Sequence, residues 1–407
     1  MLATLLLLPL ATMIDPPRSF HFGPDAAPTG ETLVAPDRRY RAGDFGYEPD
    51  SSPETPLFSV ALPEGNWRVT LTLGGATAGE TSVKAESRRL MLDRVRTRAG
   101  ETVTRSFVVN VRTPELPAPP ENAPGGAAVR LNPREAGSYS WDDRLTLEFL
   151  GRPRVQSVRI APAADVPTLY LVGDSTVTDQ RFESAASWGQ MLPGFLGDRI
   201  AVANHAESGE TLKSFLTGLR LDKALSAMKP GDYLFIQFGH NDQKAQWPQT
   251  YAAADSTYPA YLRAYVAEAR RRGATPVLVT SPERRNFDRQ GRIVPSLGGY
   301  PDAVRRVAAE EGLPLIDLNR ASIALYEALG PQQAPLAFTE GGADKTHHNN
   351  YGAWLLARAL ADELRTAVPA LAEHVTAGPF DPADPPLAGE VMLAPSAVAS
   401  ANRPAGS

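Results

Sequence analysis

From residue 168 onward, short apolar runs alternate with longer stretches of helical periodicity. The apolar runs are rich in branched and aromatic side chains and predict buried strands at 168–173, 199–203, 232–238, 275–280 and 313–317. The periodic stretches predict helices that include 212–228, 258–272, 300–311 and 351–368. Strands and helices in alternation predict a parallel, doubly wound α/β sheet covered on both faces, and we expect the flavodoxin-like strand order.

From about residue 20 to residue 167 the pattern is different. Hydrophobic and polar residues alternate with a period of two in short runs such as 67–73, 106–111 and 144–149, separated by Gly, Pro and Asp. Each run predicts a strand with one buried face, so this half predicts an antiparallel β-sandwich. Five aromatic residues here are expected mainly in its core, with a sugar-stacking surface as the alternative: Tyr40, Phe45, Tyr47, Trp67 and Trp141.

The two ends of the chain differ from both halves. Residues 2–13 are apolar over the length of a secretory signal and too short for a span of ~20 residues. They predict a signal peptide at 1–19 and a secreted or periplasmic protein, with a buried N-terminal strand or helix as the alternative. Residues 376–407 are rich in Pro and Ala and predict a disordered tail. The sandwich domain is then expected at 20–165 and the α/β domain at 166–375.

Length and composition agree with two domains. A chain of 407 residues exceeds one ordinary core. Its formal net charge of −5, without long charge runs, gives no reason to expect nucleic acid or a membrane as partner. The chain has no cysteine, which excludes disulfides, thiolate metal ligands and a cysteine nucleophile. We expect a monomer.

Candidate chemistry is concentrated in the loops that follow the predicted strands. The strand at 168–173 ends at Gly-Asp-Ser, which puts the Ser175 hydroxyl where open α/β sheets bind ligands. Asn241 follows the strand at 232–238, and Gly209 follows the strand at 199–203. Asp344 and His347 stand just before the helix at 351–368. Four loops therefore carry the parts of one possible site.

These residue types suit a serine hydrolase. A serine hydroxyl is a weak nucleophile at neutral pH and needs a base within hydrogen-bond reach. His347 is the candidate base, and Asp344 can hold its second ring nitrogen. Residues 173–177 read Gly-Asp-Ser-Thr-Val, so the Gly-x-Ser-x-Gly elbow of α/β-hydrolases is absent.

Acyl transfer also needs donors for the developing oxyanion. We expect these donors to be the backbone N–H groups of Ser175 and Gly209 and the side-chain amide of Asn241. Glycine at 209 would allow the backbone to approach the substrate closely. Asp174 and Asp242 are interpreted as carboxylates that brace their loops.

Each residue also has an ordinary interpretation. Alone, Ser175 would be a helix N-cap, Gly209 a turn glycine and Asn241 part of a turn. Asp344, His347 and His348 could form a metal cluster, but adjacent histidines tend to point apart, and no further histidine has ligand spacing. The joint occurrence of the blocks favours the hydrolase site, with neither metal nor cofactor.

In their order, the blocks resemble those of the SGNH (GDSL-like) hydrolase superfamily. Over residues 168–368 the chain is similar to bacterial rhamnogalacturonan acetylesterases, a resemblance carried by residues 173–177, 239–242, 281–288, 299–301 and 344–347. The first half, opening with Phe-His-Phe-Gly at 20–23, is similar to the galactose-binding-like module of some of these enzymes. His348 departs from the pattern, which has a bulky apolar residue there, and we expect this position to shape the substrate pocket.

The resemblance implies an O-acetylesterase that removes acetyl groups from rhamnogalacturonan, the backbone of pectin. An esterase acting on other acetylated polysaccharides such as xylan, or on lipid-like esters, is one alternative. A non-catalytic carbohydrate-binding protein is the other. The residues near the expected site are mostly polar or charged, which favours a sugar polymer over an acyl chain: Gln180, Arg181, Glu183, Gln243, Lys244, Arg284 and Arg285.

Overall fold

The computed structural model describes residues 16–397 except 24–25, 50, 53 and 119–124. Most of the predicted signal peptide therefore lies outside the described residues, and export stays a prediction. The end of that segment, Arg18 and Ser19, already belongs to the first strand. No helix in the described part of the chain is long and apolar enough to cross a membrane.

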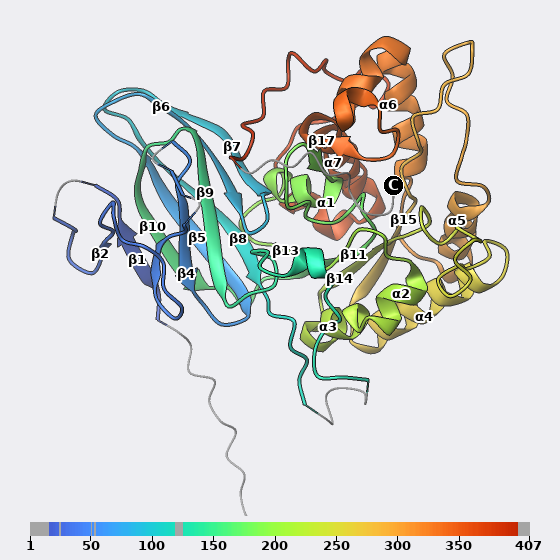
Figure 1. Ribbon diagram of the computed structural model, residues 1–407, viewed down its shortest axis with the longest axis horizontal. Coiled ribbons are helices and arrows are strands. Elements are labelled where there is room, and N and C mark those ends of the chain that lie inside the picture. The colour runs from blue at the N-terminus through green and yellow to red at the C-terminus, as the bar shows by residue number, and fades with distance from the viewer. Residues whose placement is uncertain (1–15, 24–25, 50, 53, 119–124, 398–407) are drawn as a thin grey trace, which may run out of the picture.

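The first half is a sandwich of two five-stranded sheets (Figure 1). One sheet has the order β2 (Thr32–Leu33), β1 (Arg18–His21), β10 (Val155–Pro162), β5 (Gly65–Gly74) and β8 (Thr102–Val111). The other has the order β3 (Phe45–Tyr47), β4 (Leu57–Ala61), β9 (Arg144–Arg152), β6 (Gly79–Ala85) and β7 (Arg89–Thr97). Neighbouring strands are antiparallel except β1 and β2, which are parallel.

The period-two pattern accounts for the core of the sandwich. On β5, Val69 and Leu71 are fully buried, whereas the alternating residues Arg68, Thr70 and Thr72 are partly exposed. Phe45 and Trp67 belong to this core and Tyr47 packs at its margin, which confirms the core interpretation for these three aromatic residues. Tyr40 lies beneath the Arg144 guanidinium at 4.8 Å, and Trp141 lies outside the sandwich core, against His205 of the second half.

The second half contains the predicted parallel sheet. Its strands are β11 (Thr168–Gly173), β13 (Ala201–Asn204), β14 (Tyr233–Gln237), β15 (Thr275–Val279) and β16 (Leu315–Ile316). They are all parallel in the order β13-β11-β14-β15-β16, which confirms the flavodoxin-like arrangement. The connection from β10 to β11 covers residues 163–167, so the predicted domain boundary falls within it.

Helices cover both faces of this sheet. One face packs against α1 (Trp188–Met191), α6 (Leu318–Gln333) and α7 (Asn350–Ala367). The other packs against α2 (Leu212–Thr217), α3 (Arg220–Ala227), α4 (Thr257–Arg271) and α5 (Tyr300–Glu311). A small antiparallel pair joins β12 (Ala185–Ala186) to β17 (His348–Asn349). Short 3₁₀ helices are η1 (Pro133–Glu135), η2 (Leu192–Phe195), η3 (Ala334–Ala337), η4 (Glu340–Gly342) and η5 (Pro369–His374).

One predicted helix is wrong in its extent. The structure divides 212–228 into α2 and α3, because Gly218 ends the first helix and Leu219 adopts a left-handed conformation with φ of 62°. A β-carbon makes that conformation unfavourable within a helix, so periodicity alone did not indicate the break.

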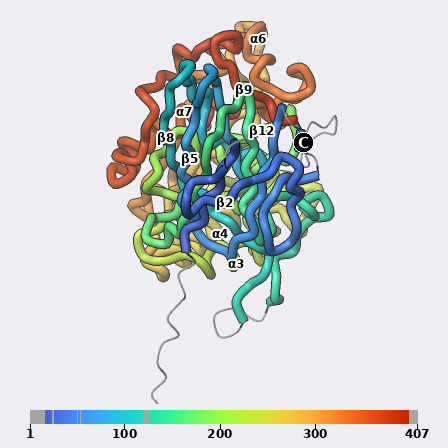
Figure 2. Tube along the Cα trace, turned by 90° about the vertical axis from the view of Figure 1, so that its left-hand side faces the viewer, coloured from blue at the N-terminus to red at the C-terminus, as the bar shows by residue number. Residues whose placement is uncertain are grey.

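The predicted disordered tail is also wrong over its described part. Residues 376–397 run back along the α/β half to the sandwich. Figure 2 shows the molecule from the sandwich side. Phe380 and Leu393 pack against the α/β core. Ser396 is buried, and its Oγ donates to Glu148 of β9 at 2.7 Å and accepts from Lys84 of β6 at 2.9 Å. The segment therefore links the two halves, whereas residues 398–407 lie outside the described part.

Candidate active site

Ser175 lies in a tight turn directly after β11. A β-carbon at Gly173 would lie 2.6 Å from the Gln237 carbonyl oxygen and 2.6 Å from Val177 Cγ2, so the turn can form only with glycine there. The Asp174 carbonyl then accepts from the N–H groups of Val177 and Thr178. The sheet thus presents Ser175 at the carboxyl end of a strand near its centre, as the sequence predicts.

The structure brings Ser175, His347 and Asp344 into one hydrogen-bonded chain. His347 Nε2 lies 2.9 Å from Ser175 Oγ, and His347 Nδ1 lies 2.8 Å from Asp344 Oδ2. Asp344 Oδ1 also accepts from the N–H groups of Thr346 at 2.6 Å and His347 at 2.9 Å. The side chains of these three residues are almost fully buried.

The pKa of Asp344 follows from these contacts. Burial raises it, but hydrogen bonds from the His347 ring and from backbone N–H groups outweigh burial and hold the pKa well below its usual range. The carboxylate therefore stays ionised and orients the His347 ring with Nε2 toward Ser175. This arrangement suits removal of the serine proton by His347 as the hydroxyl attacks a carbonyl.

Gly209 and Asn241 lie in the loops expected for the oxyanion donors. Gly209 has φ of +83°, and a β-carbon there would meet no heavy atom within 4 Å. The positive φ by itself favours glycine here, and the close approach of this backbone to the substrate stays a prediction. Asn241 Nδ2 donates to the Glu210 carbonyl at 3.1 Å, which leaves its second N–H for a ligand, and its buried Oδ1 has no partner among the described residues.

Arg134 is a contributor to this site that the sequence analysis missed. It comes from η1 in the first half of the chain, donates to the Ser208 carbonyl oxygen and pairs with Glu207 at 2.6 Å. The Ser208 carbonyl and the Gly209 N–H belong to one planar peptide group, so a contact that fixes the oxygen also fixes the direction of the N–H. Arg134 and Glu207 are 73 residues apart, and no spacing in the sequence indicates their contact.

Asp174 and Asp242 make the contacts expected of bracing carboxylates. Asp174 Oδ1 accepts from the N–H of Thr176 at 3.0 Å and from its hydroxyl at 2.8 Å. Asp242 accepts from the N–H of Leu212 at 2.9 Å and from that of Gly239 at 3.0 Å. Both carboxyls are fully buried, which raises the pKa of Asp174 and raises that of Asp242 to about 7.

His348 is buried in the protein core, and its expected role in shaping the substrate pocket stays a prediction. Its Nε2 lies 2.6 Å from the Tyr326 hydroxyl, and its ring packs against Phe338 with centroids 4.5 Å apart. Burial lowers its pKa to about 3, so the ring is a neutral core group. The ring thus bonds Tyr326, and among the described residues Asp344, His347 and His348 do not form the alternative metal cluster. Within the described residues, no group of His, Cys, Asp and Glu side chains could hold a metal ion.

Comparison with known proteins agrees with this geometry. The profile of the GDSL-like Lipase/Acylhydrolase family matches residues 171–355, a range that contains every residue of the hydrogen-bonded chain. The rhamnogalacturonan acetylesterase RhgT of Bacillus subtilis is 38% identical over 220 residues, which are 51% of this chain and 93% of the relative. The chain belongs to the GDSL-like lipase/acylhydrolase family. This GDSL-like protein is therefore an enzyme that hydrolyses esters.

Two further comparisons extend over more of this GDSL-like enzyme. An uncharacterised esterase of Bacillus subtilis, YxiM, is 27% identical over 317 residues, covering 76% of this chain and 74% of the relative. A crystal structure of a Bacillus subtilis protein named YXIM covers 86% of this chain and 98% of its own, with 24% identity and a TM-score of 0.47.

Proposed function

We propose that this enzyme is a carbohydrate O-acetylesterase whose substrate is acetylated rhamnogalacturonan. The observation that carries the proposal is the chain of contacts from Ser175 Oγ to His347 Nε2 at 2.9 Å and from His347 Nδ1 to Asp344 at 2.8 Å. The choice of substrate is supported by the name of the Bacillus subtilis relative at 38% identity.

The proposed reaction has two halves. Ser175 Oγ attacks the acetyl carbonyl while His347 takes the serine proton and then returns it to the leaving sugar hydroxyl. Water next attacks the acetyl-enzyme, again with His347 as base, and releases acetate. In both halves the N–H groups of Ser175 and Gly209 and the amide of Asn241 stabilise the oxyanion.

The surroundings of Ser175 favour a sugar over a long acyl chain. Gln180 donates to the Ser175 carbonyl at 2.9 Å, and the Arg284 guanidinium lies 3.4 Å from the His240 carbonyl. Near Gly209, a hollow of about 300 Å³ is lined largely by polar residues and by the exposed ring of Trp247. A polar hollow with one aromatic surface suits a hydroxylated ring better than a lipid tail. Acetylated xylan is the second candidate substrate.

The test compares acetate release from acetylated rhamnogalacturonan, acetylated xylan and nitrophenyl esters of short and long acids. We expect acetylated rhamnogalacturonan to have the highest kcat/KM. Ser175→Ala should lower kcat on every substrate by roughly 10⁴–10⁶, because it removes the nucleophile. Ser226→Ala, on the exposed face of α3, is the matched control and should retain full activity.

Two results would contradict the proposal. Preference for long-chain nitrophenyl esters would identify a lipid-type esterase. Near wild-type activity in folded Ser175→Ala protein would remove the catalytic assignment.

A further inference from the structure

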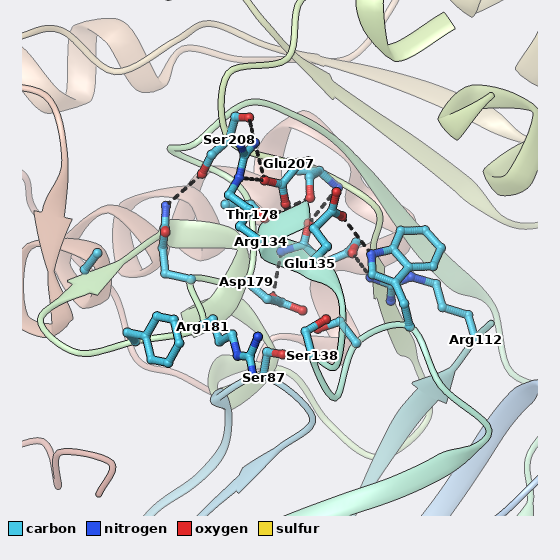
Figure 3. Close-up of a pocket in the computed structure, with 17 residues that line it drawn as sticks. Ser87, Arg112, Arg134, Glu135, Ser138, Thr178, Asp179, Arg181, Glu207 and Ser208 are labelled. Carbon is cyan, nitrogen blue, oxygen red and sulfur yellow. Dashed lines mark hydrogen bonds and ion pairs between the residues drawn. The ribbon is translucent and has the colours of Figure 1, made fainter. Parts of the chain in front are cut away.

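A cavity of about 270 Å³ lies where the two halves of the chain meet. Figure 3 shows the side chains that surround it: Ser87, Arg112 and Ser138 come from the first half, and Asp179, Arg181 and Ser208 come from the α/β half. Neither half encloses the cavity alone. Its existence therefore depends on how the sandwich docks on the α/β half.

This cavity adjoins the site built around Ser175. Gln180 lines it, and the Gln180 side chain donates to the Ser175 carbonyl at 2.9 Å. Ser208 also lines it and directly precedes Gly209. A molecule in the cavity would thus contact the loop of the nucleophile and the loop of a proposed oxyanion donor. A polymer with one unit at Ser175 would therefore place further units of the same chain toward this cavity.

The lining of the cavity matches the chemistry of a sugar ring. Trp141 and Phe182 provide aromatic surface, and the Phe182 side chain is 37% exposed although it is a large hydrophobic residue. The hydroxyls of Ser87 and Ser140 are buried and have no hydrogen-bond partner among the described residues. An unpaired buried hydroxyl is unfavourable, so a ligand that carries hydroxyl groups would be stabilised here.

The charges around the cavity favour an anionic ligand. Its three carboxylates are already paired within the protein: Asp179 with Arg89, Glu135 with Arg220, and Glu207 with Arg134. Two arginines remain without a carboxylate partner in the described part of the chain. Among the described residues, Arg181 at the rim donates to the Ala136 carbonyl at 3.2 Å and lies over the Phe182 ring at 5.1 Å.

The second arginine, Arg112, lies in the wall of the cavity. Its guanidinium packs over the Trp141 ring at 4.4 Å, and its Nε and Nη1 have no hydrogen-bond partner among the described residues. Burial and repulsion from Arg89 lower the pKa of Arg112 to about 9, although Asp179, Glu86 and Glu135 partly oppose this, so the charge is only partly compensated. A carboxylate in the cavity would supply the missing compensation.

We propose that this cavity is a subsite that binds an acidic sugar residue of the polymer whose acetylated unit lies at Ser175, with the first half of the chain forming one wall. The proposal rests on the proposed function and extends it to a uronic acid unit of the polymer. The sandwich then contributes to substrate selection through the contact of residues 134–141 with the α/β half.

The test uses the full-length enzyme with Arg181→Gln and Phe182→Ala. For Arg181→Gln we expect KM on acetylated rhamnogalacturonan to rise about tenfold, because a charge-assisted contact is lost, with a much smaller change in kcat. KM on neutral acetylated xylan should change by less than about threefold. Phe182→Ala should raise KM on both polymers, because ring stacking does not depend on the carboxylate.

Direct binding separates failure of the subsite from failure of the proposed function. Calorimetry with a deacetylated rhamnogalacturonan oligosaccharide needs no catalysis, and Arg181→Gln should weaken binding about tenfold at low salt. Arg96→Gln changes an exposed arginine on β7 that pairs with Glu80, and it serves as the matched control. Unchanged binding and KM in both cavity variants would overturn the proposal, as would an equal loss on acidic and neutral polymers in Arg181→Gln. Absence of acetate release with intact, Arg181-dependent binding would refute the proposed substrate and leave the subsite standing.

Discussion

Asn241→Ala tests the donor role that depends most on tertiary structure. The substitution removes an amide whose Nδ2 donates to the Glu210 carbonyl at 3.1 Å and whose second N–H is available to the substrate. The Asn241 Oδ1 has no partner among the described residues, so its loss breaks no contact in that part of the chain. The variant thus loses one structural hydrogen bond and one proposed oxyanion donor.

The two losses differ in size and can be measured separately. Removal of an oxyanion donor costs about 10²–10³ in kcat. Loss of the bond to Glu210 costs about 0.5–1.5 kcal/mol of stability, which corresponds to a fall of roughly 1–6 °C in Tm for a domain of this size. KM should change much less than kcat, because the donor bond strengthens as charge develops on the oxygen.

The assay is steady-state hydrolysis of nitrophenyl acetate, together with Tm of the same preparations. Asn241→Asp should lower kcat further than Asn241→Ala, because a carboxylate would repel the oxyanion. Asn66→Ala is the control: Asn66 bonds Thr168 at 2.8 Å and Asn110 at 2.9 Å, away from Ser175, so only Tm should fall. If Asn241→Ala lowers Tm while kcat stays near wild type, Asn241 is only a brace and the donor role is refuted.

Two further predictions follow from the loops around the site. Arg134→Ala should lower kcat on nitrophenyl acetate by about tenfold with little change in KM, because the Gly209 N–H remains but loses its orientation. Arg134→Lys should restore part of the lost kcat, and an unchanged kcat in Arg134→Ala would contradict this role. Burial raises the pKa of Asp242 to about 7, compared with about 3.9 in an unfolded chain. Between these two pH values the folded state therefore binds more protons than the unfolded state, so this carboxyl makes the protein less stable as pH rises. Because Asn cannot ionise, the Tm deficit of Asp242→Asn relative to wild type should be smaller at pH 8 than at pH 5, and an equal deficit at both would argue against the raised pKa.

The sequence alone determined the features that depend on local periodicity. A buried strand needs a continuous apolar run and an amphipathic helix needs a repeat near 3.6, so β11, α4 and α5 could be predicted within about two residues. Parallel strands place their carboxyl ends at one edge of the sheet. For this reason the sequence predicts that Ser175 and Asn241 belong to one site.

Tertiary structure alone decided the features that depend on contacts distant in sequence. Arg134 reaches the Ser208 carbonyl only because the sandwich docks beside β13, and no local pattern records such docking. Residues 376–397 have the composition of a disordered tail, yet Ser396 is held by Lys84 and Glu148 of the sandwich. His348 stands among polar residues in the sequence, but its ring lies in the core, where it forms a hydrogen bond with Tyr326. In each case the stabilising partner lies far along the chain, so composition and periodicity contain no signal for it.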